Sequence, residues 1–234
     1  MKIFTFGDGF ATGHLWPEWP QILQALVPDH TIINSAGIGA GPEFLVSNFV
    51  DLIPQISDAV VVFQWPSAAR FDKLLENDTW DEVIGNDAVY HFNRVYDRNN
   101  KPWWLSSNSQ QPEIKRYHEF YVQPEQQQTR IRIWQTLVEH TCRSLGIQYI
   151  FCSTDHQEKF SRQPMYSDHR LNEVQPSPWV HMRWLVEVIL PQLDCAVDFQ
   201  RQQKLEKILL DHKWRAYEPD RESRWNDMIV QLNG

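Results

Sequence analysis

The first residues of the chain constrain its fold most. The run Ile3–Phe6 is apolar and rich in β-forming residues, and Gly7-Asp8-Gly9 ends it. This pattern is typical of a buried parallel strand that leads into a tight loop. Ile22, Leu23 and Leu26 then recur at helical spacing. A strand, a Gly/Asp turn and a helix in this order predict an open α/β sheet, whose ligands lie at the carboxyl ends of the strands.

Further apolar runs alternate with helical patterns along the chain. We expect parallel strands at residues 2–6, 31–34, 59–64 and 147–152. Residues 59–64 form the most continuous apolar run, which is typical of a strand in the centre of a sheet. The alternation predicts an α/β domain over residues 1–193, a three-layer, flavodoxin-like sandwich with helices on both faces of the sheet.

Two regions lie outside this alternation. Residues 68–112 lack a regular pattern, and we expect a long insert there with one or two short helices, anchored by Trp103-Trp104-Leu105. Inserts of this length within a compact domain are often lids or binding loops. Residues 194–234 follow the end of the α/β pattern and carry two amphipathic stretches, which predict a C-terminal helical extension.

Composition and charge exclude several classes of function. A formal net charge of −8 over 234 residues argues against binding of a nucleic-acid backbone, which needs a cationic face. The three cysteines form no C-x-x-C pair, so neither a zinc site nor a disulfide framework is indicated. No stretch has the length of a transmembrane helix, and the first apolar run is too short for a signal peptide. We therefore expect a protein that is made in the cytoplasm and does not insert into membranes.

The N-terminal motif resembles a motif of a known enzyme family. Gly7-Asp8-Gly9-Phe10 is similar to the first block of the SGNH hydrolases, the GDSL-type esterases and deacetylases, which carry Gly-Asp-Ser-Phe there. The nucleophilic serine of that family falls on Gly9, and a residue without a side chain cannot form an acyl intermediate. The second block of the family, Asn-x-Ala-x-x-Gly, resembles residues 34–39, and its oxyanion-binding glycine would be Gly39.

The remaining family positions also carry residues that cannot do the chemistry. The oxyanion-binding asparagine of the family falls near Pro66, and its catalytic aspartate and histidine fall on Asn172 and Gln175. Neither an asparagine nor a glutamine can take a proton from a nucleophile. The resemblance therefore implies an SGNH-type fold with a degenerate catalytic site. The glycines at 37, 39 and 41 do not have the G-x-G-x-x-G spacing of a dinucleotide site, and we expect no cofactor and no metal.

A rearranged active site is the alternative. Side chains near the expected strand ends that could replace the missing groups are Asp8, Ser35, Ser67 and His181. His181 matches a helix-borne histidine that is common after the last block of the family, and we interpret it as a packing or capping residue. In this alternative the chain is an SGNH-like esterase or deacetylase that acts on carbohydrate or small esters.

A binding role is what the other sequence features favour. The chain has eleven tryptophans, and residues 194–234 add apolar faces to a domain that is already complete. An acidic, aromatic-rich chain of this kind also resembles uncharacterised SGNH-like proteins of tailed phages, which implies a place in a virion. The expected partner is another protein or further copies of the chain, with a glycan as a further option. The candidate contact residues are Trp214, Trp225, Met228, Ile229 and Leu232, followed by Trp103 and Trp104. The alternative is that these side chains pack on the chain's own core.

Overall fold

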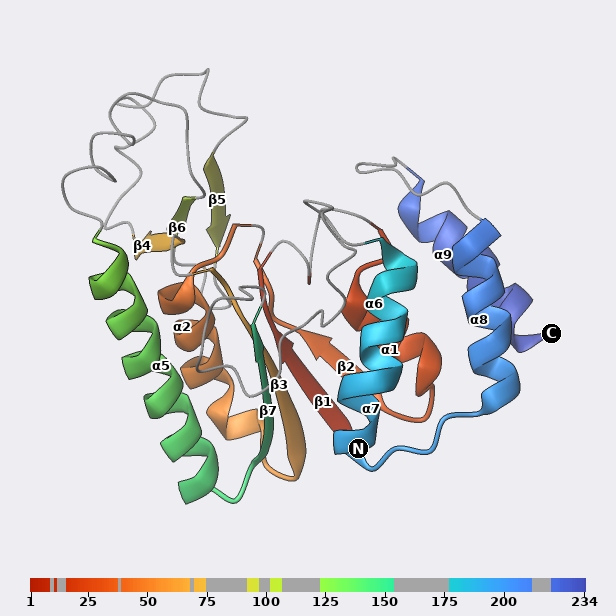
Figure 1. The fold of residues 1–234 in the computed structure, drawn as a ribbon, viewed down its shortest axis with the longest axis horizontal. Coiled ribbons are helices and arrows are strands. Elements are labelled where there is room, and N and C mark those ends of the chain that lie inside the picture. Colours follow the sequence, from red (N-terminus) through yellow and green to blue (C-terminus); the bar gives the residue numbers. More distant parts are fainter. Residues whose placement is uncertain are drawn as a thin grey trace.

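The fold is a layered α/β arrangement (Figure 1). We describe a computed structural model of the chain. It describes residues 1–8, 11, 16–37, 39–67, 70–74, 92–96, 102–106, 123–153, 177–211 and 220–234. A four-stranded parallel sheet lies between two layers of helices, and two C-terminal helices add a further layer on one side.

The parallel sheet confirms the strands that the sequence predicts. Its members are β1 (Lys2–Phe6), β2 (Thr31–Asn34), β3 (Ala59–Trp65) and β7 (Gln148–Ser153). The strand order is β2-β1-β3-β7, and every neighbouring pair is parallel. β3 lies inside the sheet and all seven of its residues are buried, as its continuous apolar run predicts.

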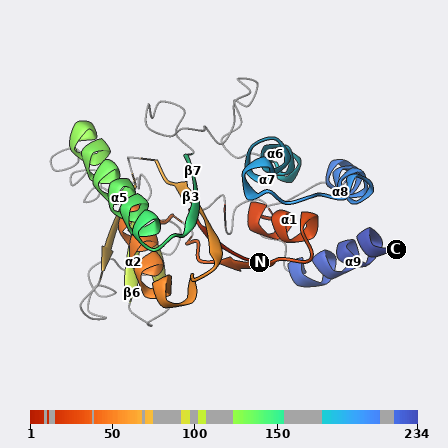
Figure 2. The same ribbon diagram turned by 90° about the horizontal axis from the view of Figure 1, so that it is seen from below.

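Successive side chains of each strand point to opposite faces of the sheet and form two separate hydrophobic cores. Val61, Phe63 and Trp65 point to the face covered by α2 (Pro42–Leu52), which continues into the 3₁₀ turn η1 (Ile53–Gln55), and by α5 (Pro124–Ser144). Val60 and Val62 point to the opposite face. That face is covered by α1 (Trp19–Leu26) and by a helix made of α6 (Pro178–Trp184), the π-helical η4 (Leu185–Ile189) and α7 (Leu190–Leu193). Figure 2 shows these helix layers on either side of the sheet.

The start of α6 illustrates how the sequence sets these helices. The Ser177 side chain accepts a hydrogen bond from the Val180 amide at 3.4 Å, and Pro178 occupies the first turn, where its missing N–H is not needed. Side chains of the helix then enter the core on the α1 side, among them Trp184, which meets Trp19 edge to face at 5.5 Å between ring centroids.

The C-terminal stretch forms two helices that pack on the chain itself. They are α8 (Phe199–Asp211) and α9 (Arg221–Asn233), which lie outside α1 and α6 in Figure 2. Leu205 and Leu209 of α8 are buried in the same core as α1 and α6. The predicted helices are therefore present. They cover the outer face of the α1 and α6 layer, so this layer is enclosed from both sides.

The described residues of the insert form strands that the sequence pattern does not predict, and the one or two short helices expected there fall outside the described residues. These strands are β4 (Phe71–Leu74), β5 (Phe92–Tyr96) and β6 (Pro102–Ser106), an antiparallel sheet of order β4-β6-β5. β-forming residues such as Trp103 and Val95 pair across these strands and satisfy each other's backbone, which favours a sheet over a helix. The small sheet lies at the α2 side of the molecule, where the Trp103 ring meets Phe44 edge to face at 5.8 Å.

All three cysteines of the chain are free. Cys142 of α5 and Cys152 of β7 are buried, and Cys195 is half-buried. In the described ranges no helix combines the length and apolarity needed to cross a membrane. Groups of three or more metal-ligating side chains are likewise absent from these ranges.

Candidate functional site

The carboxyl ends of the parallel strands meet at one edge of the sheet, where α/β proteins bind ligands. We call this place the strand-end edge. It contains the residues that end or follow β1, β2, β3 and β7, namely Gly7, Asp8, Ser35, Pro66, Ser67 and Ser153. Asp8, Ser35 and Ser153 are buried there. The structure therefore brings together the fallback candidates Asp8, Ser35 and Ser67 at the edge where the sequence predicts a site.

A buried chain of hydrogen bonds fixes Asp8 in place. The Gln64 amide nitrogen donates to Asp8 Oδ1 at 2.6 Å, and the Trp19 indole N–H donates to Gln64 Oε1 at 2.8 Å. Asp8 is only 1% exposed, and Gln64 is fully buried at the end of β3. The amide of Gln64 can donate to one neighbour and accept from the other, which is why a glutamine suits this position. These two hydrogen bonds connect the loop after β1 with β3 and α1.

An arginine forms an ion pair with the second oxygen of the Asp8 carboxylate. Arg70 follows β3, and its Nη2 lies 3.2 Å from Asp8 Oδ2. The Arg70 side chain is 18% exposed, so this ion pair is partly shielded from solvent. Both Asp8 oxygens thus contact groups that stabilise a fixed carboxylate. An aspartate held in this way supports the local structure.

The loop after β2 is tied to the end of β1. The Asn34 side-chain nitrogen donates to the Ala11 carbonyl at 2.8 Å, and the Gly37 amide donates to the Gly7 carbonyl at 3.0 Å. Gly39, the expected oxyanion-binding residue, has a φ of 79°, a left-handed conformation that favours glycine. This glycine is therefore explained by the turn alone, and the loop brings β1 and β2 into contact at the strand-end edge.

The fallback serine and histidine have different environments. Ser35 is buried, and its hydroxyl has no hydrogen-bond partner among the described residues. His181 is buried on α6, and burial lowers the pKa of its imidazole to about 3. A histidine with so low a pKa is neutral and binds a proton poorly at neutral pH. Its burial agrees with its interpretation as a packing residue.

The predicted degenerate positions are only partly described. Pro66 follows β3 directly, so a residue without a side-chain amide occupies that strand end. Gly9, Asn172 and Gln175 lie outside the described residues.

The predicted contact residues are mostly covered by the chain itself. Met228 and Leu232 are buried, and Trp225 and Ile229 are half-buried against the same core. The Trp225 ring meets Trp16 edge to face at 5.9 Å. These four side chains therefore pack on the chain's own core, which is the alternative to a partner contact that the sequence left open. Trp103 is also buried, against Phe44, while Trp214 and the side chain of Trp104 lie outside the described residues.

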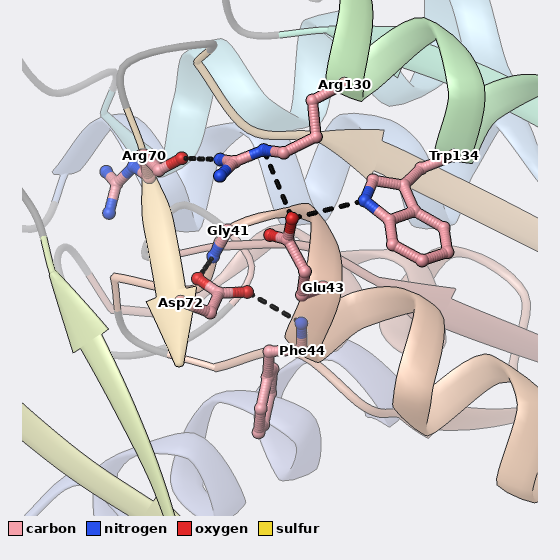
Figure 3. Close-up of polar contacts among 7 residues, drawn as sticks. All are labelled: Gly41, Glu43, Phe44, Arg70, Asp72, Arg130 and Trp134. Atoms are coloured by element: carbon pink, nitrogen blue, oxygen red, sulfur yellow. Dashed lines mark hydrogen bonds and ion pairs between the residues drawn. The ribbon is translucent and has the colours of Figure 1, made fainter. Parts of the chain in front are cut away.

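A second polar cluster lies at the start of α2, and sequence reasoning missed it (Figure 3). The buried Asp72 of β4 accepts hydrogen bonds from the backbone N–H groups of Gly41 and Phe44, at 2.5 and 2.6 Å. Beside it, Glu43 of α2 binds Arg130 of α5, with Nε and Oε1 3.1 Å apart. In the sequence, a helix start at Gly41-Pro42-Glu43 can attract a carboxylate. Asp72 lies about thirty residues further along the chain, so nothing in the sequence links it to this helix start.

Comparisons with known proteins add a distant structural similarity. The sequence matches no protein-family model, and no curated protein matches it. Among solved structures, the chain is similar to the crystal structure of the lipase/acylhydrolase from Enterococcus faecalis. The sequence identity is 17%, the match covers 64% of this chain and 74% of that chain, and the TM-score is 0.26. A match of this size assigns neither an activity nor a ligand to the chain.

Proposed function

We propose that the chain is a non-catalytic, SGNH-like binding or structural protein. In this proposal it is a subunit of a larger assembly, such as a phage virion, and contacts protein or glycan there. The observation that carries the non-catalytic part is the internal pairing of the strand-end edge. Asp8 is engaged by Gln64 and Arg70, and Gln64 is engaged at both ends of its amide. Groups that are satisfied in this way stabilise the fold and are not themselves poised to act as a base on a substrate.

The sequence at the same edge supports this proposal. Gly9 and Pro66 stand where the family has its nucleophile and one oxyanion donor. Loss of a nucleophile together with its base removes most of the rate enhancement that a catalytic triad supplies. The Ser35 hydroxyl is not a ready substitute, because it has no base as a partner within the described part of the chain.

Exposed apolar side chains on α5 support a contact with protein. Ile133 is 60% exposed and Leu137 is 45% exposed, and they lie one helical turn apart on the same face. The opposite face of α5, with Ile131 and Val138, is buried against the sheet. Adjacent exposed apolar residues on the outer face of a helix are a common feature of protein contact sites.

An ester-hydrolysis assay tests the non-catalytic part. We expect no turnover of short-chain p-nitrophenyl esters or acetylated sugars above the background rate. Ser35→Ala, Ser67→Ala and His181→Ala variants serve as matched controls. Turnover by the unmodified protein that one of these substitutions abolishes would overturn the proposal and favour the esterase with a rearranged site.

Light scattering tests the assembly part for copies of the chain itself. We expect self-association that increases with concentration and that the double substitution Ile133→Ser, Leu137→Ser weakens. Leu145→Ser is the control, because Leu145 is also exposed but lies beyond the end of α5. A chain that stays monomeric at every concentration would contradict assembly from its own copies. An equal effect of Leu145→Ser would contradict a role for the α5 face.

A further inference from the structure

The small antiparallel sheet is attached to the main domain through a buried carboxylate. Asp72 lies on β4, yet both of its oxygens accept hydrogen bonds from the first turn of α2, from the amides of Gly41 and Phe44 (Figure 3). A Cβ atom on residue 41 would collide with this carboxylate, so the close approach requires glycine. Trp103 of β6 packs on Phe44 at the same place. These contacts dock the sheet on α2.

Among the described residues, no cation is a direct partner of the Asp72 carboxyl. Asp72 forms no ion pair with any described residue, and Arg130 of α5, whose charge acts on Asp72, is engaged elsewhere (Figure 3). Arg130 binds Glu43 and donates to the Arg70 carbonyl at 2.8 Å. The guanidinium of Arg70 contacts Asp8 instead.

Two further neighbours of Asp72 within the described ranges do not compensate its charge. Glu43 of α2 adds a second negative charge nearby. On β6, the residue paired with Asp72 is the uncharged Leu105.

Two opposing effects therefore act on the protonation of this group. The two backbone N–H groups, the N-terminus of α2 and the positive charge of Arg130 favour a carboxylate. Burial without a paired cation disfavours it, and the charge of Glu43 acts in the same direction. Burial is the larger effect, and it raises the pKa of Asp72 to about 7. The protonation state of Asp72 is thus sensitive to pH changes around neutrality.

We propose that Asp72 is a proton-sensitive latch that holds the β4-β6-β5 sheet on α2 more tightly as the pH falls. The direction follows from linkage. In the undocked sheet the carboxyl faces water and has an ordinary pKa of about 3.9. The docked form binds the proton more tightly, so protons favour docking.

This linkage fixes the pH range of the latch. The gain in docking is complete below about pH 4 and decreases by up to about tenfold per pH unit as the pH rises, until it is lost above about pH 7.

Amide hydrogen exchange of Gly41 and Phe44 tests the latch in the full chain. Between about pH 5 and about pH 7, we expect the opening equilibrium of these amides to increase several-fold with each pH unit, after correction for the intrinsic exchange rate. Above this range it should level off. In Asp72→Asn the dependence on pH should disappear. The slope is the readout, since the asparagine can accept only one of the two N–H groups and the level itself can change.

Asp198→Asn is the matched control. Asp198 accepts a hydrogen bond from the Gln200 amide at the start of α8, at 2.9 Å, but it is exposed. This substitution should leave the pH dependence at Gly41 and Phe44 unchanged. A flat wild-type profile, or a slope that persists in Asp72→Asn, would overturn the proposal.

A second measurement needs no variant. A ¹³C titration of the Asp72 carboxyl in the wild-type protein should show a midpoint well above the ordinary value of about 3.9. A midpoint at or below that value would overturn the latch. In Glu43→Gln the midpoint should move to lower pH, because the substitution removes a nearby negative charge and releases Arg130.

Discussion

Gln64 is a single residue on which the strand-end edge depends. It is fully buried, and it connects Asp8 of the β1 loop with Trp19 of α1. No apolar residue of similar size can make both hydrogen bonds. Removing the amide would leave the Asp8 carboxylate and the Trp19 indole N–H each without this partner. A buried polar group that loses its partner costs about 1–3 kcal/mol.

Gln64→Leu should therefore lower the free energy of unfolding by about 2–5 kcal/mol, which chemical denaturation followed by circular dichroism can measure. Gln148→Leu is the matched control on β7. Gln148 also donates through its amide, to the Gln192 carbonyl at 2.8 Å, but it is exposed. Its replacement should cost less than about 1 kcal/mol. Equal losses in the two variants would contradict the role of Gln64 in the buried chain.

At the residue scale, the sequence predicts which positions reach the strand-end edge but not their partners. Ser35 directly follows a predicted strand and Asp8 lies two residues beyond another, and the topology alone brings such residues together. Gln64 and Arg70 carry no comparable signal, because a glutamine that ends an apolar run resembles any strand end. Asp72 was missed for the same reason. Its partners are backbone amides of α2, and backbone contacts leave no pattern in the side-chain sequence.

At the scale of elements, substitutions in α8 can test whether the C-terminal helices form part of the core. Leu209 is 2% exposed and packs in the core on the α1 side, whereas its neighbour Leu210 is 60% exposed. The two residues have the same side chain and the same helix propensity. Their substitution therefore isolates the effect of burial.

We expect Leu209→Ala to lower the free energy of unfolding by about 2–5 kcal/mol and Leu210→Ala to change it by less than about 0.5 kcal/mol. Thermal and chemical denaturation of both variants provide the measurement. Small, equal effects would contradict the packing of α8 and would instead favour an extension that is available to a partner.

The helices and parallel strands could be predicted because their patterns are local. The parallel strands are short apolar runs, and α5 has buried residues at helical spacing, such as Ile131, Val138 and Cys142. The β4-β6-β5 sheet could not be predicted in this way. Its strands are short, and β4 pairs with β6 across an interval of sequence that contains β5. β5 and β6 are close in sequence, but no Asn-Gly or Asp-Gly turn motif joins them.

At the scale of the whole molecule, two buried groups respond to acid in opposite directions. Burial lowers the pKa of His181 to about 3, so the unfolded chain binds this proton first and stability falls as the pH drops below about 6.5. Burial raises the pKa of Asp72 to about 7, so here the folded chain binds the proton first and stability rises as the pH drops from about 7 to about 4. Over their shared range the two contributions oppose each other.

Variants that remove one group should reveal the other. With His181→Gln, the free energy of unfolding should rise from about pH 7 to about pH 5 relative to the wild-type profile, by up to about 1.4 kcal/mol per pH unit. With Asp72→Asn it should fall relative to the wild type over the same range. Denaturation at several pH values gives these profiles. Curves for both variants that run parallel to the wild-type curve would contradict the assignment.

The strand order has a consequence for folding during synthesis on the ribosome. β3 pairs with β1 on one side and with β7 on the other. β3 ends at Trp65 but β7 begins only at Gln148, so β7 is translated long after β3. At translation rates of ~5–20 residues per second, several seconds pass before the residues of β7 leave the ribosome. During that time the most apolar strand of the nascent chain has an edge that its final neighbour cannot yet cover, so its protection falls to chaperones or to the speed of synthesis.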